Sequence, residues 1–313
     1  MWSSIKCSQT PGKDFTTFLA STRTRPDNGI FSVFFLVYKH PMQTMVVNLV
    51  DVFGVDKPVI GMVHLTPLPG SSKSVSVEDV FENALMDAGA LKSGGVDGVQ
   101  VENFGDAPFM KPGKVDSTVV SLVACVANEV KKATGLPTGI FVLANAVVES
   151  LFAVKASGAS WVRANMYNLA YIADEGYIEA SAPKAERKRT FLGPDVKIFA
   201  DVLVKHGSHV IVPDIPLSYH VTRVEELGAD AVILSGTRTS AETPYQRVVE
   251  AKQLAKKPVL VGSGVNLENV HRLLKVADGA IVGTYFKRVG ELFNPVDLER
   301  VRLLMSVVRA LRV

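Results

Sequence analysis

The chain has 313 residues, enough for one α/β barrel of roughly 250 residues together with an extension. Hydrophobic residues make up 47% and charged residues 21%, a balance that predicts a soluble protein with a large buried core. The net charge is only +3, and no basic run is interleaved with aromatic residues, which excludes the common classes of nucleic-acid-binding protein. We therefore expect no nucleic-acid partner.

The first 45 residues differ in composition from the rest of the chain. They are rich in serine and threonine, and basic residues outnumber acidic ones, as in a mitochondrial transit peptide. The alternative is a disordered extension, with Met42 or Met45 as the true start. The hydrophobic run at residues 30–38 is too short to cross a bilayer, which needs about 20 residues, so we expect no transmembrane segment. We place the folded domain at residues 46–313, in the cytoplasm or, with a transit peptide, in mitochondria.

Eight short hydrophobic runs recur about every 30 residues in this domain. They are nearly continuous, as strands buried on both faces require, rather than alternating with polar residues. The runs occupy residues 58–64, 96–102, 137–143, 160–165, 196–201, 230–236, 258–264 and 278–284.

Amphipathic segments between these runs predict helices, most clearly at residues 77–92, 117–134, 245–256 and 267–276. The same pattern predicts that Cys125 is a buried free thiol. Eight alternations of strand and helix predict a (β/α)₈ TIM barrel of parallel strands over residues 46–313. A doubly wound open sheet is the competing fold, although it usually has fewer strands.

Polar residues collect at the C-terminal ends of the predicted strands, the rim where barrel enzymes place their chemistry. For a substrate pocket at this rim we predict His64, Asn103, Asn145 and Thr237.

Two glycine-rich turns follow the last two predicted strands, at residues 261–265 and 282–284. Glycine lets backbone N–H groups approach an anion, and barrels commonly bind phosphate at the ends of their seventh and eighth strands. Tight packing of the turns without a ligand is the alternative. The predicted phosphate-binding residues are Gly262, Ser263, Gly264, Gly283 and Thr284, with Ser235 and Gly236 from the sixth strand.

Five further residues are catalytic candidates: Glu102, Arg163, Asn165, Asp201 and Lys205. A carboxylate at a strand end is costly to bury unless it is paired or reactive, and a carboxylate beside an amine can work as base and acid. Arg163 and Asn165, two residues apart on one strand, point to the same side. A structural ion pair of Arg163 with Glu102 or Asp201 is the alternative.

Metal and cofactor signals are weak. His206 and His209 fit a loop better than a ligand set, and no cluster of histidine, cysteine and carboxylates has convincing metal spacing. We predict no cofactor, although rim carboxylates leave room for a loosely held Mg²⁺.

Five motifs, in this order along the chain, resemble those of the BtpA/SgcQ family: residues 60–70, 101–109, 201–206, 258–269 and 278–284. The resemblance runs from about residue 57 to 302 and implies a barrel of the ribulose-phosphate-binding type. It also implies a link to photosystem I biogenesis for the photosynthetic namesake, although relatives occur in non-photosynthetic organisms. Many relatives carry Arg, Asn and Asp in a row where this chain has Ala144, Asn145 and Ala146.

Two classes of function follow. The first is an enzyme, an isomerase, lyase or hydrolase, that acts on a small phosphorylated metabolite such as a sugar phosphate or nucleotide. The second is a non-catalytic assembly or stability factor that keeps the barrel. The charged rim favours the enzyme, whereas the uncharged Ala144 and Ala146 favour the second class. Association into a homo-oligomer stays open.

Overall fold

The computed structural model describes residues 48–193, 195–205, 207–236 and 241–312, together with the backbone of β1 (Lys6–Gln9) and β2 (Thr16–Leu19). The chain divides into two compact units, Met1–Met45 and Val46–Val313. Within the first unit, β1 and β2 pair antiparallel. The remainder of the predicted extension lies outside the described residues.

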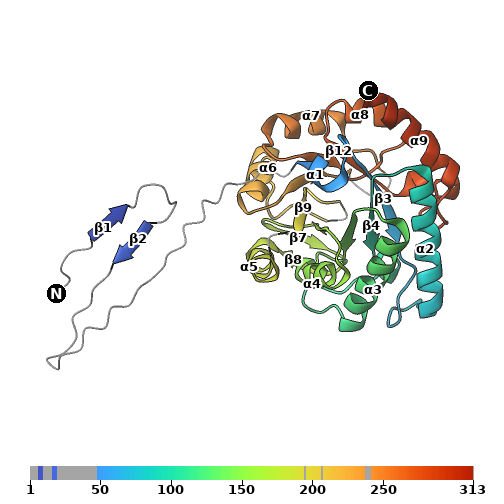
Figure 1. The fold of residues 1–313 in the computed structure, drawn as a ribbon, viewed down its shortest axis with the longest axis horizontal. Helices are drawn as coiled ribbons and strands as arrows, with labels where there is room; N and C mark the ends of the chain where they lie inside the picture. The colour runs from blue at the N-terminus through green and yellow to red at the C-terminus, as the bar shows by residue number, and fades with distance from the viewer. Residues whose placement is uncertain are drawn as a thin grey trace. The chain divides into compact units, whose positions relative to one another are not determined.

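Eight parallel strands of the second unit close into a barrel, which confirms the predicted TIM-barrel fold (Figure 1). Their order around the barrel is β10-β11-β12-β3-β4-β5-β6-β9, and each strand falls on one of the eight hydrophobic runs. Nearly every strand residue is buried, which explains why the runs are continuous. The strands are β3 (Val59–His64), β4 (Gly98–Glu102), β5 (Thr138–Phe141), β6 (Trp161–Ala164), β9 (Lys197–Val202), β10 (Ala231–Leu234), β11 (Val259–Val261) and β12 (Gly279–Val282).

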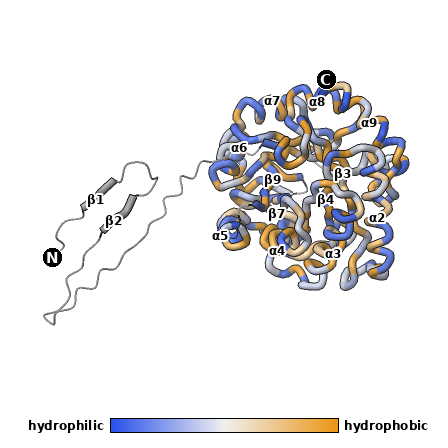
Figure 2. Tube along the Cα trace, in the orientation of Figure 1, coloured by the Kyte–Doolittle hydropathy of each residue, from blue (hydrophilic) through white to orange (hydrophobic). Residues whose placement is uncertain are grey.

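Helices surround the barrel (Figure 1), and hydrophobic and hydrophilic residues are interleaved along them (Figure 2), as expected of amphipathic helices that cover a sheet. They are α2 (Val77–Gly94), α3 (Ser117–Thr134), α4 (Val147–Ser157), α5 (Ala182–Leu192), α6 (Leu217–Glu226), α7 (Tyr245–Leu254), α8 (Val270–Leu274) and α9 (Leu298–Leu311). The expectation of a buried Cys125 is wrong. The thiol is exposed because Cys125 lies on the outer face of α3, between the buried Ala124 and Val126.

A short helix, α1 (Leu49–Phe53), covers the N-terminal end of the barrel. The ring of Phe53 meets the ring of Trp161 edge-on at 5.2 Å between centroids, and Trp161 is the first residue of β6. Phe53 also lies against Gly98, the first residue of β4, where a Cβ would stand 2.6 Å from the phenylalanine ring. The barrel is therefore plugged at the end opposite its rim, by residues that precede the first barrel strand.

The long connection between β6 and α5 forms a hairpin of β7 (Ala170–Ala173) and β8 (Gly176–Glu179). An antiparallel bridge between Ile172 and Ser208 ties this hairpin to the segment that follows β9. The hairpin thus holds together the connections that leave two neighbouring strands at the rim.

Replacing Phe53 with alanine should lower the free energy of unfolding by about 3–5 kcal/mol, because a buried aromatic side chain would leave a cavity against Trp161. Denaturant unfolding measures this change. A chain that begins at Val46 keeps α1 and should match the stability of the full chain. An alanine variant as stable as the parent would show that α1 is not part of the barrel core.

Candidate active site

A cavity of about 470 Å³ lies at the C-terminal ends of the barrel strands. It brings together most of the residues that the sequence singled out, because the ends of all eight parallel strands meet at this rim. The predicted residues in its wall are His64, Glu102, Arg163, Asn165, Lys205, Gly262, Ser263, Gly264, Gly283 and Thr284.

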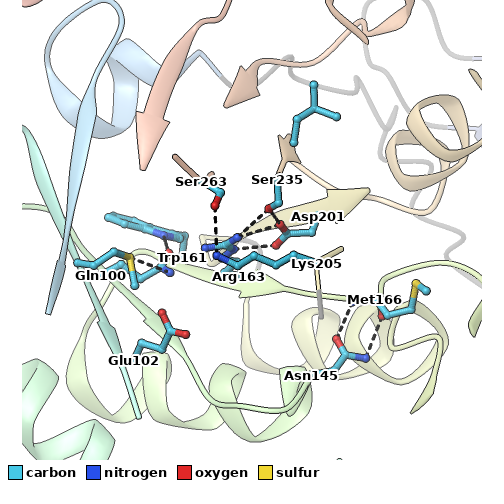
Figure 3. A network of polar contacts seen from close by, with 12 residues as sticks. Gln100, Glu102, Asn145, Trp161, Arg163, Met166, Asp201, Lys205, Ser235 and Ser263 are labelled. Atoms are coloured by element: carbon cyan, nitrogen blue, oxygen red, sulfur yellow. Dashed lines mark hydrogen bonds and ion pairs between the residues drawn. The ribbon is translucent and has the colours of Figure 1, made fainter. Parts of the chain in front are cut away.

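The guanidinium of Arg163 is held by a buried carboxylate (Figure 3). Its Nε and one terminal nitrogen donate to the two carboxylate oxygens of Asp201 at 2.7 and 2.8 Å, a bidentate pair. The hydroxyl of Ser235 donates to Asp201 at 2.7 Å and stands 3.4 Å from the guanidinium. Asp201 is only 1% exposed and does not line the cavity, so it orients Arg163 from behind.

Arg163 itself reaches the cavity, where its guanidinium carbon lies 5.2 Å from the centre of the Phe141 ring. Arg163 therefore forms a buried ion pair with Asp201 and also lines the cavity. The two interpretations of Arg163 from the sequence are compatible.

Glu102 ends β4 and is buried in the cavity wall. Burial raises its pKa from 4.5 to about 7, because the nearby positive charges of Arg163 and Lys205 offset the cost of burying the carboxylate only in part. The Nε2 of His64 lies 3.8 Å from Glu102. Burial, with the charges of Lys287, Lys205 and Arg163, lowers the pKa of His64 well below its usual value, so this imidazole is neutral at neutral pH.

Lys205 follows β9 and stands beside the predicted phosphate turn, with its Nζ 3.5 Å from the hydroxyl of Ser263. Burial lowers its pKa from 10.5 to about 8, and the charge of Arg163 adds to this effect, while Glu102 and Asp201 oppose it. The cavity therefore holds a carboxyl and an amine whose pKa values approach each other near neutrality.

The glycine-rich turns line the cavity from the ends of β11 and β12. Gly264 has a φ of +67°, and a Cβ there would collide with the backbone of Ala241. Gly283 leaves room for His64, whose Cε1 would be 2.8 Å from an added Cβ. Among the described residues, the amide N–H groups of Gly264 and Thr284 donate no hydrogen bond. The glycines of these turns thus allow close packing, and the two N–H groups are left to bind a ligand.

Sequence reasoning missed Arg300 on α9, which also lines the cavity. Its Nε donates to the carbonyl oxygen of Tyr285 at 2.6 Å, and its guanidinium carbon lies 4.4 Å from the centre of the Tyr285 ring. The sequence carried no signal for this role, because Arg300 alternates with other arginines on an amphipathic helix.

Several predicted residues lie outside the cavity wall, each for a local reason. The side chain of Asn103 accepts the N–H of Leu143 and donates to Asp106, which fixes the connection after β4. Asn145 binds the backbone of Met166 in both directions, apart from the cluster around Arg163 (Figure 3). The others are Ser235, which supports Arg163 and Asp201, and Gly236, which packs against Ala241; Thr237 and His206 lie outside the described residues.

In the described part of the chain, no group of three or more histidine, cysteine or carboxylate side chains could hold a metal ion. In the same part, no helix has the length and hydrophobicity needed to cross a membrane.

A model of the BtpA family matches residues 55–310, which covers the whole barrel from its first strand to the last helix. The chain belongs to the BtpA family. This confirms the resemblance inferred from the five motifs.

Relatives extend across distant organisms. An uncharacterized protein of Archaeoglobus fulgidus is 41% identical over 82% of this chain and 98% of its own length. The photosystem I biogenesis protein BtpA of a Synechocystis strain is 39% identical over 81% of this chain and 88% of its own length. An uncharacterized mitochondrial protein of Caenorhabditis elegans is 31% identical over 81% of this chain and 94% of its own length.

Solved structures share the fold at low sequence identity. Orotidine 5'-phosphate decarboxylase of Pyrococcus horikoshii matches with a TM-score of 0.51 and 15% identity, over 80% of this chain and 99% of that one. Thiamine phosphate pyrophosphorylase of Pyrococcus furiosus matches with a TM-score of 0.51 and 13% identity, over 84% of this chain and 98% of that one. Both comparisons show a shared barrel.

Substituting Glu102 with glutamine should stabilise the protein at pH 8. Burial raises the pKa of Glu102 to about 7 in the folded state, so its contribution to stability is lost as the pH rises from 4.5 to 7. A pKa difference of this size corresponds to about 3 kcal/mol, so glutamine should raise the free energy of unfolding by about that amount at pH 8 and by little at pH 4.

Denaturant unfolding at the two pH values measures this effect, and Glu299→Gln on the exposed face of α9 is the control, with a change within about 0.5 kcal/mol. A loss of stability at pH 8 would instead identify Glu102 as a partner in a structural ion pair.

Proposed function

We propose that the protein is an enzyme that acts on a small phosphorylated metabolite by acid–base chemistry at the rim cavity. The observation that carries the proposal is the pair Glu102 and Lys205. Both are buried in one cavity wall, and their pKa values are about 7 and about 8. Groups whose environments bring their pKa values toward neutrality are typical of general acids and bases.

The phosphate end of this proposal rests on the ends of β11 and β12. Glycine-rich turns, the hydroxyl of Thr284, and the cations Lys205 and Arg300 line the same part of the cavity. Amide N–H groups and cations of this kind favour an anion. The names of the two barrels with the same fold, a 5'-phosphate decarboxylase and a thiamine phosphate pyrophosphorylase, support a phosphorylated ligand.

The charges assign roles to the remaining side chains. Between about pH 7 and pH 8, Glu102 is mainly a carboxylate and can accept a proton, while Lys205 is mainly an ammonium and can donate one. Arg163, fixed by Asp201, can hold an oxyanion or a carboxylate of the substrate. Proton transfers of this kind serve an isomerase, a lyase or a hydrolase.

The second candidate is a non-catalytic assembly factor, supported by the name of the photosystem I relative. The specific observation in its favour is Ala144, an uncharged residue in the cavity wall. This second candidate function predicts that the cavity binds phosphorylated ligands but does not convert them to products.

Ribose 5-phosphate should raise the melting temperature of the full chain by binding at the two glycine-rich turns. At 100 times its Kd the ligand adds about 2.7 kcal/mol of stability, and a tenfold loss of affinity reduces this to about 1.4 kcal/mol. Arg300→Gln should cause a loss of at least this size, because it removes a cation from the cavity wall.

Arg302→Gln is the matched control, since Arg302 lies on the same helix and pairs with the exposed Glu299. Thr284→Asp, which adds a carboxylate at the turn, should abolish the shift. Gly264 is unsuitable for this test because any side chain there collides with the backbone of Ala241. An undiminished shift in both Arg300→Gln and Thr284→Asp would place the anion elsewhere.

The pH dependence of catalysis should report the two buried groups. With a substrate in hand, kcat/KM should follow a bell-shaped curve with limbs near pH 7 and pH 8, because activity needs ionised Glu102 and protonated Lys205. Glu102→Gln and Lys205→Gln should each lower kcat by about 10²–10⁴, and each residual profile should lack one limb. A profile flat from pH 5 to pH 9 in the parent protein would contradict the assignment.

A further inference from the structure

Aromatic side chains form a distinct part of the cavity wall. We call them the aromatic wall, defined as Phe104, Phe109, Phe141 and Tyr171. The rings of Phe104 and Phe109 lie 6.4 Å apart between centroids, and the ring of Phe104 lies 5.3 Å from that of His64. Phe104 and Phe109 belong to the motif at residues 101–109, but the acid–base pair does not account for these rings.

The aromatic wall has two parts. Phe104 and Phe109 follow β4, and Phe104 lies beside His64, which packs against the turn at Gly283. Phe141 and Tyr171 come from the side of the barrel opposite the phosphate turns. In the closed order of eight strands, β5 and β6 stand four places from β11 and β12, which is halfway round. Phe141 is the last residue of β5, and Tyr171 lies in the connection that follows β6. Aromatic rings therefore line the cavity both opposite the turns and beside His64, and the charged groups Glu102, Arg163 and Lys205 lie in the same wall.

Packing of the hydrophobic core accounts for Tyr171, which is buried in a cluster with Met166 and Ile178, but not for the three phenylalanines of the aromatic wall. Phe104, Phe109 and Phe141 belong to none of the three clusters of buried hydrophobic residues in the described part of the chain. Phe104 and Phe109 are only half-buried. The ring of Phe104 also lies 6.0 Å, between centroids, from that of Phe293, a residue that is 83% exposed. Phe104 and Phe109 therefore border the cavity rather than fill the core.

Leu143 and Ala144, which follow β5, add hydrophobic surface to the cavity wall. Asp174 and Glu175, between β7 and β8, line the cavity near Tyr171. An aromatic face of this kind prefers a flat ring, because stacked rings gain more than the area they bury. The volume of about 470 Å³ lies within the range of about 300–1,000 Å³ of small-molecule sites, large enough for a ring and a phosphate together.

We propose that the ligand of this cavity carries an aromatic or heteroaromatic ring, stacked on the aromatic wall, in addition to its phosphate. The substrate class is then a ring-bearing phosphate ester, such as a nucleoside monophosphate, rather than a plain sugar phosphate. This inference rests on the proposed function, since it takes the turns as the phosphate site.

Calorimetric titration of the full chain tests the proposal with probes that differ by a ring alone. The pairs are AMP and UMP against ribose 5-phosphate, and phenyl phosphate against methyl phosphate. At least one nucleotide should bind about 5- to 150-fold more tightly than ribose 5-phosphate, the factor that stacking of one ring provides. Phenyl phosphate should likewise bind more tightly than methyl phosphate.

Variants locate the ring. Phe104→Leu and Phe109→Leu keep hydrophobic bulk but remove the aromatic face, so they should reduce the preference for the ring-bearing probe and leave the Kd of ribose 5-phosphate unchanged. Phe191→Leu, on the outer surface of α5 and 81% exposed, is the matched control and should change neither affinity.

The outcomes separate this inference from the proposed function. Equal affinities within each probe pair, or a ring preference unchanged in both phenylalanine variants, would overturn the ring while leaving the phosphate site in place. Failure of every phosphorylated probe to bind would overturn both.

Discussion

The bidentate pair of Arg163 and Asp201 fixes a buried positive charge at the rim, where burial is the main cause of the pKa shifts of Glu102 and Lys205. A guanidinium buried inside a barrel destabilises the protein unless an opposite charge compensates it. Both carboxylate oxygens of Asp201 accept hydrogen bonds from Arg163, and the hydroxyl of Ser235 donates to the same carboxylate. The positive charge that remains near the cavity moderates the pKa of Glu102 and lowers that of Lys205. Loss of the pair would leave an unpaired buried charge and alter both groups at once.

Much of this arrangement could be predicted from the sequence, because it depends on periodicity. Strands buried on both faces need continuous hydrophobic runs, so the eight strands could be predicted from the sequence. Because parallel strands close into a barrel, their C-terminal ends meet at one rim. For that reason the convergence of Glu102, Arg163 and Lys205 followed from their positions at strand ends. The family followed from motifs at the same ends.

What the sequence could not predict depends on side-chain direction beyond the strands. Asn103 and Asn145 sit at the correct rim, but each satisfies neighbouring backbone groups instead of facing the cavity. Arg300 enters the cavity from a helix surface, where an arginine is ordinarily solvated. Phe104 and Phe109 lie in the motif at residues 101–109, but only the path of the chain after β4 brings them to the cavity wall.

The energetics of the pair Glu102 and Lys205 link burial to function. With the usual pKa values of 4.5 and 10.5, moving a proton from the ammonium to the carboxylate would cost about 8 kcal/mol. With values of about 7 and about 8, the same exchange costs about 1.4 kcal/mol, close to one pKa unit. Burial destabilises both charged forms. Under the proposed function, the stability lost at neutral pH would favour proton exchange with a substrate. In a purely structural rim, burying these two groups would lower the stability of the protein with no functional benefit.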